Sequence, residues 1–246
     1  MLHKINLFLR SLLFSILMMI ATIFYSLFCL SVYCFISRAS SHYLIMRWTR
    51  GIIWLLKVTC NVNYHVEGFE NIPKDRNTII FSKHQSTWET FFLPSLFHET
   101  AIILKRELLW VPFFGWGLAT TDPIAINRNK GDSAMEQIIK KGGKYLEAGR
   151  SILIFPEGTR ITPGKVGKYR VGGARLAVAT GYPIIPIAHD AGLYWPKRGF
   201  IKNPGTVQVR IGPLIETQNR TPEEVLQAAK GWIEDAVKKI SSKKGS

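Results

Sequence analysis

The sequence predicts an α/β fold: a single domain with a central, largely parallel mixed sheet flanked by helices, preceded by an N-terminal membrane-anchoring helical segment. Three observations lead to this prediction. Short apolar runs bounded by turn residues alternate with helical patterns after residue 61, which is typical of parallel sheets. The 246 residues are 47% hydrophobic, enough to bury one sizeable core. Residues 11–37 carry no charged side chain.

The uncharged stretch, residues 11–37, is rich in Leu, Ile, Phe and Met. It exceeds the roughly 20 apolar residues that a membrane-spanning helix needs. It is also longer than the apolar part of a signal peptide and lacks a clear small-residue cleavage site, so we expect it to remain in the mature protein. Lys4 and Arg10 precede it, and Arg38 and Arg47 follow it. Because both flanks are basic, the positive-inside rule assigns no orientation.

The next segment, residues 43–58, mixes Trp and aliphatic residues with Arg47, Arg50 and Lys57. Its uncharged run is too short to cross a bilayer, so we predict an amphipathic helix in the headgroup layer. A buried core helix is the alternative, because periodicity does not show what covers an apolar face. We therefore predict an anchor over residues 1–60 and a separate folded domain over residues 61–246.

The anchor has two possible arrangements. One is a single span followed by an interfacial helix, and the other is a two-helix hairpin that dips into one leaflet. We favour the hairpin, because the basic residues at both of its ends can then face the same anionic leaflet.

Beyond the anchor, strand and helix patterns alternate. We expect strands over residues 62–66, 78–82, 101–104, 123–126, 151–155, 183–187 and 207–211. We expect helices over residues 87–97, 132–146, 173–180 and 222–240. The last helix has a clear start, with Thr221 as its cap, Pro222 at its first position and Glu224 three residues after the cap.

The formal net charge of +15 favours anionic partners, namely nucleic acid, phospholipid headgroups or phosphorylated substrates, although a solvated basic surface is the alternative. The chain contains no GxSxG, HExxH or GxxxxGK[ST] motif. It therefore lacks the signatures of serine hydrolases, zinc proteases and P-loop enzymes. Its three cysteines lack metal-site spacing, so we predict neither a disulfide framework nor a metal site.

The first candidate site follows the strand at residues 78–82. His84 comes directly after this strand, and Glu89 falls in the first turn of the next predicted helix. Ligands of α/β sheets bind beyond the carboxyl ends of the strands, and a His beside a carboxylate can act as a general base. A hydrogen-bonded loop histidine without a catalytic role is the alternative.

The second candidate site is the segment Phe-Pro-Glu-Gly-Thr-Arg, residues 155–160, at the end of another strand. Gly158 permits a sharp turn, and Thr159, Arg160 and the loop amides together can hold a phosphate. Lys105 and Arg128 follow two further strands and can add positive charge. Cations on loops are also typical of any solvated surface.

Four blocks in order resemble the glycerolipid acyltransferase family, and within it the bacterial 1-acyl-sn-glycerol-3-phosphate acyltransferases. They are His84 to Glu89, the run from Lys105 through Gly117 to Arg128, residues 155–160, and the apolar-Pro-apolar strand at residues 184–187. The resemblance covers roughly residues 64–210. One departure is Glu89, because Asp is the family's usual residue at this position.

The resemblance implies that residues 61–246 are an acyltransferase catalytic domain. His84 and Glu89 would be catalytic, while Lys105, Arg128, Glu157, Gly158, Thr159 and Arg160 would bind substrate. The acceptor would be lysophosphatidic acid at an anionic phospholipid membrane. Acyl-CoA or acyl carrier protein would be the cosubstrate, without a metal, another cofactor or a nucleic acid partner.

The implied location is the bacterial inner (cytoplasmic) membrane, with the catalytic domain facing the cytoplasm. A different lysolipid acceptor is one alternative to this function, and a non-catalytic, membrane-anchored anion-binding module is another.

Overall fold

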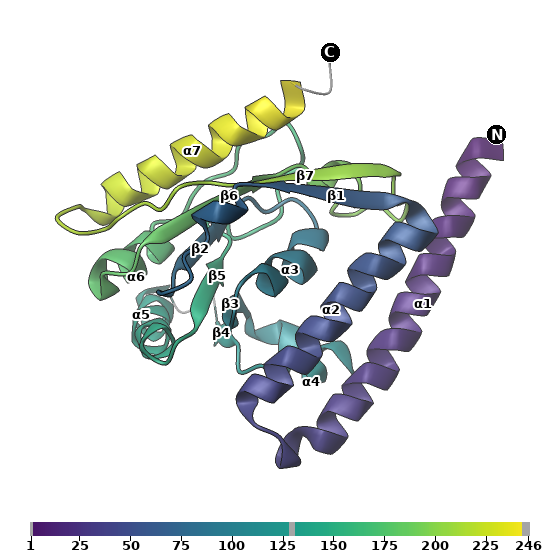
Figure 1. Cartoon of the computed structure of the whole chain (residues 1–246), viewed down its shortest axis with the longest axis horizontal. Helices are drawn as coiled ribbons and strands as arrows, with labels where there is room; N and C mark the ends of the chain where they lie inside the picture. Colours follow the sequence, from purple (N-terminus) through teal and green to yellow (C-terminus); the bar gives the residue numbers. More distant parts are fainter. Residues whose placement is uncertain (1, 128–130, 243–246) are drawn as a thin grey trace.

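The computed structural model describes residues 2–127 and 131–242 and contains one seven-stranded sheet (Figure 1). The strand order is β1-β7-β6-β2-β5-β3-β4, and every pair is parallel except β6 with β7. The strands are β1 (Val62–Glu67), β2 (Ile79–Ser82), β3 (Thr100–Lys105), β4 (Ile124–Ile126), β5 (Ser151–Ile154), β6 (Ile184–His189) and β7 (Gly205–Ile211). The predicted α/β class with a largely parallel mixed sheet is confirmed.

Helices cover both faces of the sheet, and the strands divide their side chains between them. On β2, Ile79 and Phe81 join the core under α5 (Gly131–Glu147), α6 (Gly172–Thr180) and α7 (Pro222–Ser242). Ile80 points to the other face and joins the core under α2 (Arg38–Cys60) and α3 (Trp88–Phe92). This alternation is the period of two that a strand imposes on its side chains, and burial on both faces explains the continuous apolar runs of β2, β5 and β6.

Two helical segments differ from the prediction. Residues 87–97 form α3 (Trp88–Phe92) followed by a 3-10 turn (Leu93–Leu96), because Pro94 has no N–H to continue an α-helix. The second is a short helix, α4 (Phe114–Ala119), preceded by a 3-10 turn (Arg106–Trp110) that the strand and helix patterns did not predict. Six residues are too few to show a helical period in the sequence.

The N-terminus forms an antiparallel helical hairpin of α1 (Leu2–Val32) and α2 (Arg38–Cys60) (Figure 1). Ser37 caps α2, since its side chain accepts a hydrogen bond from the Ser40 N–H. The first helix begins and ends earlier than the predicted residues 11–37: it includes Lys4 and Arg10, and it stops before the 3-10 turn at Tyr33–Phe35. The turn at residues 33–37 separates the two helices at the point where the predicted apolar segment ended.

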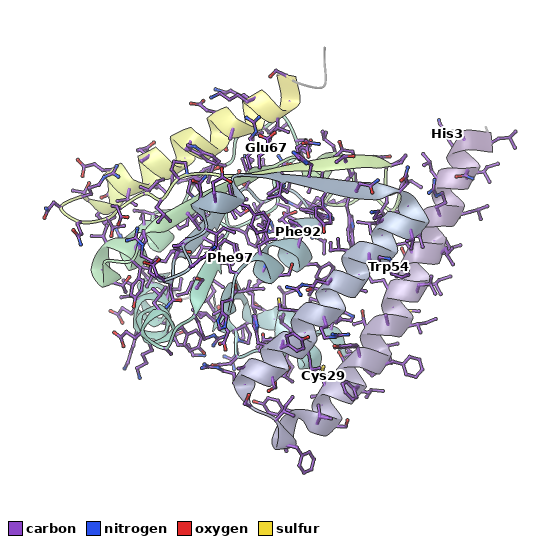
Figure 2. All side chains as sticks on the ribbon, viewed as in Figure 1. His3, Cys29, Trp54, Glu67, Phe92 and Phe97 are labelled. Carbon is purple, nitrogen blue, oxygen red and sulfur yellow. The ribbon has the colours of Figure 1, made fainter. Side chains whose placement is uncertain are left out.

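The inner apolar side of α2 packs against the domain. Ile52, Leu56 and Cys60 are buried in the same core as strands β1 and β6. The alternative of a buried core helix therefore describes the inner face of α2. Its opposite face exposes Trp54, whose side chain points away from the sheet (Figure 2).

The helix α1 is attached to the domain along most of its length. Near its start, the Ser11 hydroxyl accepts a hydrogen bond of 2.9 Å from the Lys202 N–H, and Phe14 packs edge-on against Trp195. Near its end, the Ser26 hydroxyl donates a 2.7 Å hydrogen bond to the Phe113 carbonyl. The hydrogen bond of Ser11 joins residues that are 191 positions apart in the sequence, and that of Ser26 joins residues 87 positions apart. The periodicity of the sequence could not reveal such distant contacts.

The outer face of α1 is apolar and exposed, and its side chains project away from the domain (Figure 2). It includes Leu9, Leu13, Met19 and Phe24, the last of which is 71% exposed. Among the described residues, the segment from Leu2 to Phe35 is the one helix long and apolar enough to cross a membrane, with mean hydropathy 2.3. Its length and composition agree with association with a membrane.

Candidate active site

The carboxyl ends of β2, β5 and β6 lie side by side, because these strands are parallel neighbours. His84 follows β2, Phe155 follows β5, and His189 ends β6. Sequence segments that are about seventy and one hundred residues apart therefore meet at one edge of the sheet. This is the edge at which α/β sheets bind ligands.

His84 and Glu89 form the predicted pair. The distance between His84 Nδ1 and Glu89 Oε1 is 2.9 Å. Since a carboxylate oxygen only accepts, the proton of the neutral ring lies on Nδ1, and Nε2 keeps its lone pair. Glu89 Oε1 also accepts hydrogen bonds from the N–H groups of Gln85 (2.8 Å) and Ser86 (2.7 Å). The carboxylate therefore fixes both the ring and the loop that carries it.

The environment of Glu89 keeps this carboxyl group ionised. Its side chain is fully buried, and burial raises the pKa of a carboxyl group. The nearby His189, the hydrogen bond from His84 and the Ser86 N–H oppose this effect and hold the pKa of Glu89 below its usual value. A buried carboxylate beside an imidazole can stabilise the imidazolium that forms when the ring takes a proton.

Phe155 sets the plane of the His84 ring. The two rings stack with centroids 4.1 Å apart and planes inclined by 18°. The sequence placed Phe155 at the start of the second motif, but gave it no role. Its position at the end of the strand next to β2 explains the contact.

A cavity of about 590 Å³ opens beside His84. Its inner lining is largely aliphatic and aromatic and comes from α2, β3, β5 and α4, including Ile45, Met46, Trp48, Ile102, Leu104, Leu118 and Ile154. The volume lies in the range of ligand-binding pockets, and an apolar lining with few polar groups is their usual composition. The cavity is therefore suited to a molecule with a long apolar part.

Four of the predicted binding residues line this cavity, namely Lys105, Gly158, Thr159 and Arg160. Gly158 has φ +67°, a left-handed conformation that favours glycine, and it turns the chain directly after β5. Arg160 Nη1 donates a 2.8 Å hydrogen bond to the Thr87 hydroxyl beside the start of α3. Arg128, which was also predicted, lies outside the described residues.

Lys197 is a cation of the site that the sequence did not reveal. It lines the same cavity, and its ammonium group donates to the Arg160 carbonyl (2.7 Å) and the Thr159 hydroxyl (3.2 Å). It lies in a loop after β6, outside the motifs from which the other cations were predicted. The one signal in the sequence that could have indicated Lys197 is its position in a loop that follows a predicted strand, since ligands bind beyond the carboxyl ends of parallel strands.

Glu157 was predicted to bind substrate, and the structure does not support that role. Its side chain is fully buried and pairs with Lys83, with 2.7 Å between Oε1 and Nζ. Its second oxygen, Oε2, accepts a 3.0 Å hydrogen bond from the His84 N–H. Both carboxylate oxygens are thus bound within the protein, and Glu157 does not line the cavity.

Together these groups can remove a proton from a hydroxyl group and hold an anion next to it. His84 Nε2 is a base, Arg160 and Lys197 supply positive charge, and the cavity takes an apolar chain. None of these functions requires a nucleophilic side chain of the protein.

Comparison with known proteins identifies similar sequences. The model of the family described as Acyltransferase matches residues 63–190. A 1-acyl-sn-glycerol-3-phosphate acyltransferase of Pseudomonas aeruginosa is 48% identical over 207 residues, which cover 83% of this chain and 80% of that protein. The mouse 1-acyl-sn-glycerol-3-phosphate acyltransferase alpha is 28% identical over 183 residues, covering 73% of this chain and 64% of the mouse protein.

A solved structure is similar over nearly the whole chain. The crystal structure of the 1-acyl-sn-glycerophosphate (LPA) acyltransferase PlsC from Thermotoga maritima matches with a TM-score of 0.81 and 26% sequence identity. The match covers 97% of both chains, so it includes the N-terminal hairpin as well as the sheet.

Proposed function

Since this chain belongs to the acyltransferase family, we propose that it is a 1-acylglycerol-3-phosphate O-acyltransferase. It transfers a fatty acyl chain from an acyl thioester to the 2-hydroxyl of 1-acyl-glycerol-3-phosphate and so forms phosphatidic acid for phospholipid biosynthesis. The observation that carries this proposal is the His84–Glu89 pair beside an apolar cavity that also contains Arg160 and Lys197. The names of the similar proteins support the same acceptor.

The proton transfers follow from the state of the His84 ring. Nε2 takes the proton of the acceptor hydroxyl while the hydroxyl oxygen attacks the thioester carbon. Glu89, held ionised, stabilises the resulting imidazolium. When the tetrahedral intermediate collapses, the C–S bond breaks, the ester forms, and the imidazolium returns the proton to the leaving thiolate. The chemistry consumes the acyl thioester as a cosubstrate and uses no metal or redox cofactor.

Negative charge develops at two places in this reaction. The acceptor phosphate is bound by Arg160 and Lys197, with Lys105 as a further cation that lines the cavity. The oxyanion needs N–H donors, and those of Gln85 and Ser86 are already bound to Glu89. The N–H groups of Thr159 and Arg160 in the loop after β5 are therefore our candidates for the oxyanion hole.

The apolar cavity receives the fatty acyl chain. Residues of α1 and α2 contribute to its lining, so the N-terminal hairpin belongs to the substrate site as well as to the anchor. An acyl chain that enters from the bilayer exchanges one apolar environment for another, which lowers the cost of moving it into the protein.

The hairpin arrangement of the anchor fits the structure better than a lone transmembrane span. Because α1 contacts the domain from Ser11 to Ser26, few of its turns are free to be surrounded by lipid on all sides. We propose that its exposed apolar face lies in one leaflet of the inner membrane, with the catalytic domain in the cytoplasm. The basic residues at its two ends then meet anionic headgroups.

The proposed function is tested by thiol release from oleoyl-CoA by purified protein in vesicles, measured with and without 1-oleoyl-glycerol-3-phosphate. We expect thiol release that depends on the acceptor, together with phosphatidic acid detected by mass spectrometry. A parallel reaction with oleoyl-acyl carrier protein decides the donor. Transfer to lysophosphatidylcholine or lysophosphatidylethanolamine but not to lysophosphatidic acid would identify a different acceptor, and no transfer from either donor would leave only a binding module.

A further inference from the structure

Lys83, the residue directly before the catalytic histidine, has a fully buried side chain. Its ammonium group has three acceptors, namely Glu157 Oε1 at 2.7 Å, Glu234 Oε1 at 2.7 Å and the Lys165 carbonyl at 3.4 Å. An ammonium group has three N–H donors, so this set satisfies it completely. Because a buried charge is costly without its partners, these three acceptors hold the Lys83 ammonium group in one position.

Glu234 reaches this cluster from α7, on the face of the sheet opposite the N-terminal hairpin (Figure 1). It is separated from Lys83 by 151 residues. It also accepts a 2.7 Å hydrogen bond from the Tyr169 hydroxyl. Burial and then the hydrogen bond to Glu234 raise the pKa of Tyr169, so its hydroxyl stays protonated and continues to donate.

Glu157 connects the cluster to the catalytic histidine. One of its oxygens pairs with Lys83, and the other accepts the hydrogen bond from the His84 N–H. A shift of the Lys83 ammonium therefore moves Glu157, and with it the peptide that carries the His84 ring. The Gly167 N–H, 3.2 Å from Glu157 Oε1, is the only other group bonded to this carboxylate among the described residues.

The same peptide segment is held from its other side. His189 Nδ1 accepts a 3.3 Å hydrogen bond from the Ala191 N–H, so the proton lies on Nε2, which donates to the Lys83 carbonyl at 2.7 Å. The His84 carbonyl accepts a 2.7 Å hydrogen bond from the Ile161 N–H. Every polar backbone group from the Lys83 carbonyl to the His84 carbonyl is thus bonded within the protein.

We propose that Lys83 and Glu234 are positioning residues, which act through Glu157 to hold His84 at the distance and angle that acyl transfer requires. This inference rests on the proposed function for its kinetic readout. Glu234 lies on α7, outside residues 63–190, which match the family model. The proposal therefore gives the C-terminal helix a role in the active site. Neither residue touches the cavity, so neither is a catalytic residue.

The test compares Glu234→Gln with Asp235→Asn on the same helix. Gln has the shape of Glu and can still accept a hydrogen bond from Lys83, but it removes one charge from the pair. Asp235 is 67% exposed at its side chain and pairs only with Lys238 among the described residues, so it is a matched control. A small displacement of a catalytic group lowers the rate far more than it lowers binding, so we expect Glu234→Gln to reduce kcat about tenfold. The KM values for donor and acceptor should stay within about twofold of wild type.

A structural readout that does not depend on turnover accompanies the kinetics. The proton on His84 Nδ1 lies in the hydrogen bond to Glu89, and its NMR resonance reports the geometry of that bond. It can be assigned by its disappearance in His84→Gln. We expect the resonance to move upfield or broaden in Glu234→Gln and to be unchanged in Asp235→Asn. Lys83→Met should have a larger effect of the same kind, and adding Glu234→Gln to it should reduce kcat by much less than tenfold further.

Wild-type kcat and an unshifted resonance in folded Glu234→Gln would overturn the proposal. A change in KM alone, or an equal loss in Asp235→Asn, would do the same. A wild-type protein that forms no phosphatidic acid would instead refute the proposed function. The His84 resonance then decides the positioning claim by itself, because it requires no substrate.

Discussion

The ring and the backbone of His84 are fixed by contacts from two segments of the chain, residues 84–89 and residues 155–160. Glu89 binds Nδ1, Phe155 stacks on the ring, and Glu157 accepts the backbone N–H. The sequence predicted the first contact from a spacing of five residues. It could not predict the other two in detail, because they depend on the pairing of β2 with β5.

The extra methylene of Glu89, compared with the family's usual Asp, lets one oxygen collect three hydrogen bonds. Glu89→Asp moves the carboxylate back by about one bond length, yet it keeps the charge, so we expect it to retain appreciable kcat. Glu89→Gln can fill the same space without stabilising an imidazolium, and it should lose roughly 10²-fold or more in kcat. Steady-state kinetics on both folded variants check this ranking. Equal activity of the two would show that the charge of Glu89 is irrelevant.

Arg160 and Lys197 lie together at the cavity and should act on the acceptor more than on the thioester. We expect Arg160→Ala and Lys197→Ala each to raise the KM for lysophosphatidic acid roughly tenfold or more, because a hydrogen bond to a charged group contributes about 1.5–3 kcal/mol. The donor KM should change little. Arg198→Ala, an exposed cation next to Lys197 that does not line the cavity, is the control. A defect confined to the donor KM would assign these cations to the thioester's phosphates.

At the scale of elements, the pattern of strands was predictable because each strand of this sheet is short, apolar and bounded by turn residues. All seven expected strands are present, with ends shifted by only a few residues. The anchor was harder to predict, since the side of α2 that meets protein is as apolar as one that meets lipid. Its packing depends on Ile52 and Leu56 meeting strands that are distant in sequence.

The exposed face of α1 is the element that should determine membrane binding. Deleting residues 1–60 is too severe a test, because it also removes core side chains of α2. We instead expect the triple variant Leu13→Gln, Met19→Gln and Phe24→Gln to keep the fold, since all three side chains are exposed. It should lose most of its binding to vesicles, because it removes apolar area from the membrane-facing surface.

Sedimentation with anionic vesicles measures this binding. Activity on a short-chain lysophosphatidic acid that is soluble below its micelle concentration is the control, and it should remain near wild type. Undiminished vesicle binding of the triple variant would assign the membrane contact to another surface.

At the scale of the whole molecule, the hairpin arrangement predicts the membrane topology of the protein. The N-terminus and the catalytic domain should lie on the same side of the membrane, because α1 and α2 run antiparallel along one side of the domain (Figure 1). Cys34 is exposed, so the background for this test is Cys34→Ser. In intact cells, His3→Cys and a cysteine at Asp235 should both be shielded from a membrane-impermeant thiol reagent. Labelling at position 3 alone would support a single transmembrane span.

The proposed acyl transfer depends on one group, His84, which acts as its base. The direct measurement is the rate of phosphatidic acid formation from oleoyl-CoA and lysophosphatidic acid by folded His84→Ala. The matched control is His65→Ala, which removes an exposed histidine on β1. We expect His84→Ala to lose roughly 10²–10⁴-fold in kcat, the usual contribution of a general base, while His65→Ala keeps the wild-type rate. A near-wild-type rate in well-folded His84→Ala would contradict the mechanism.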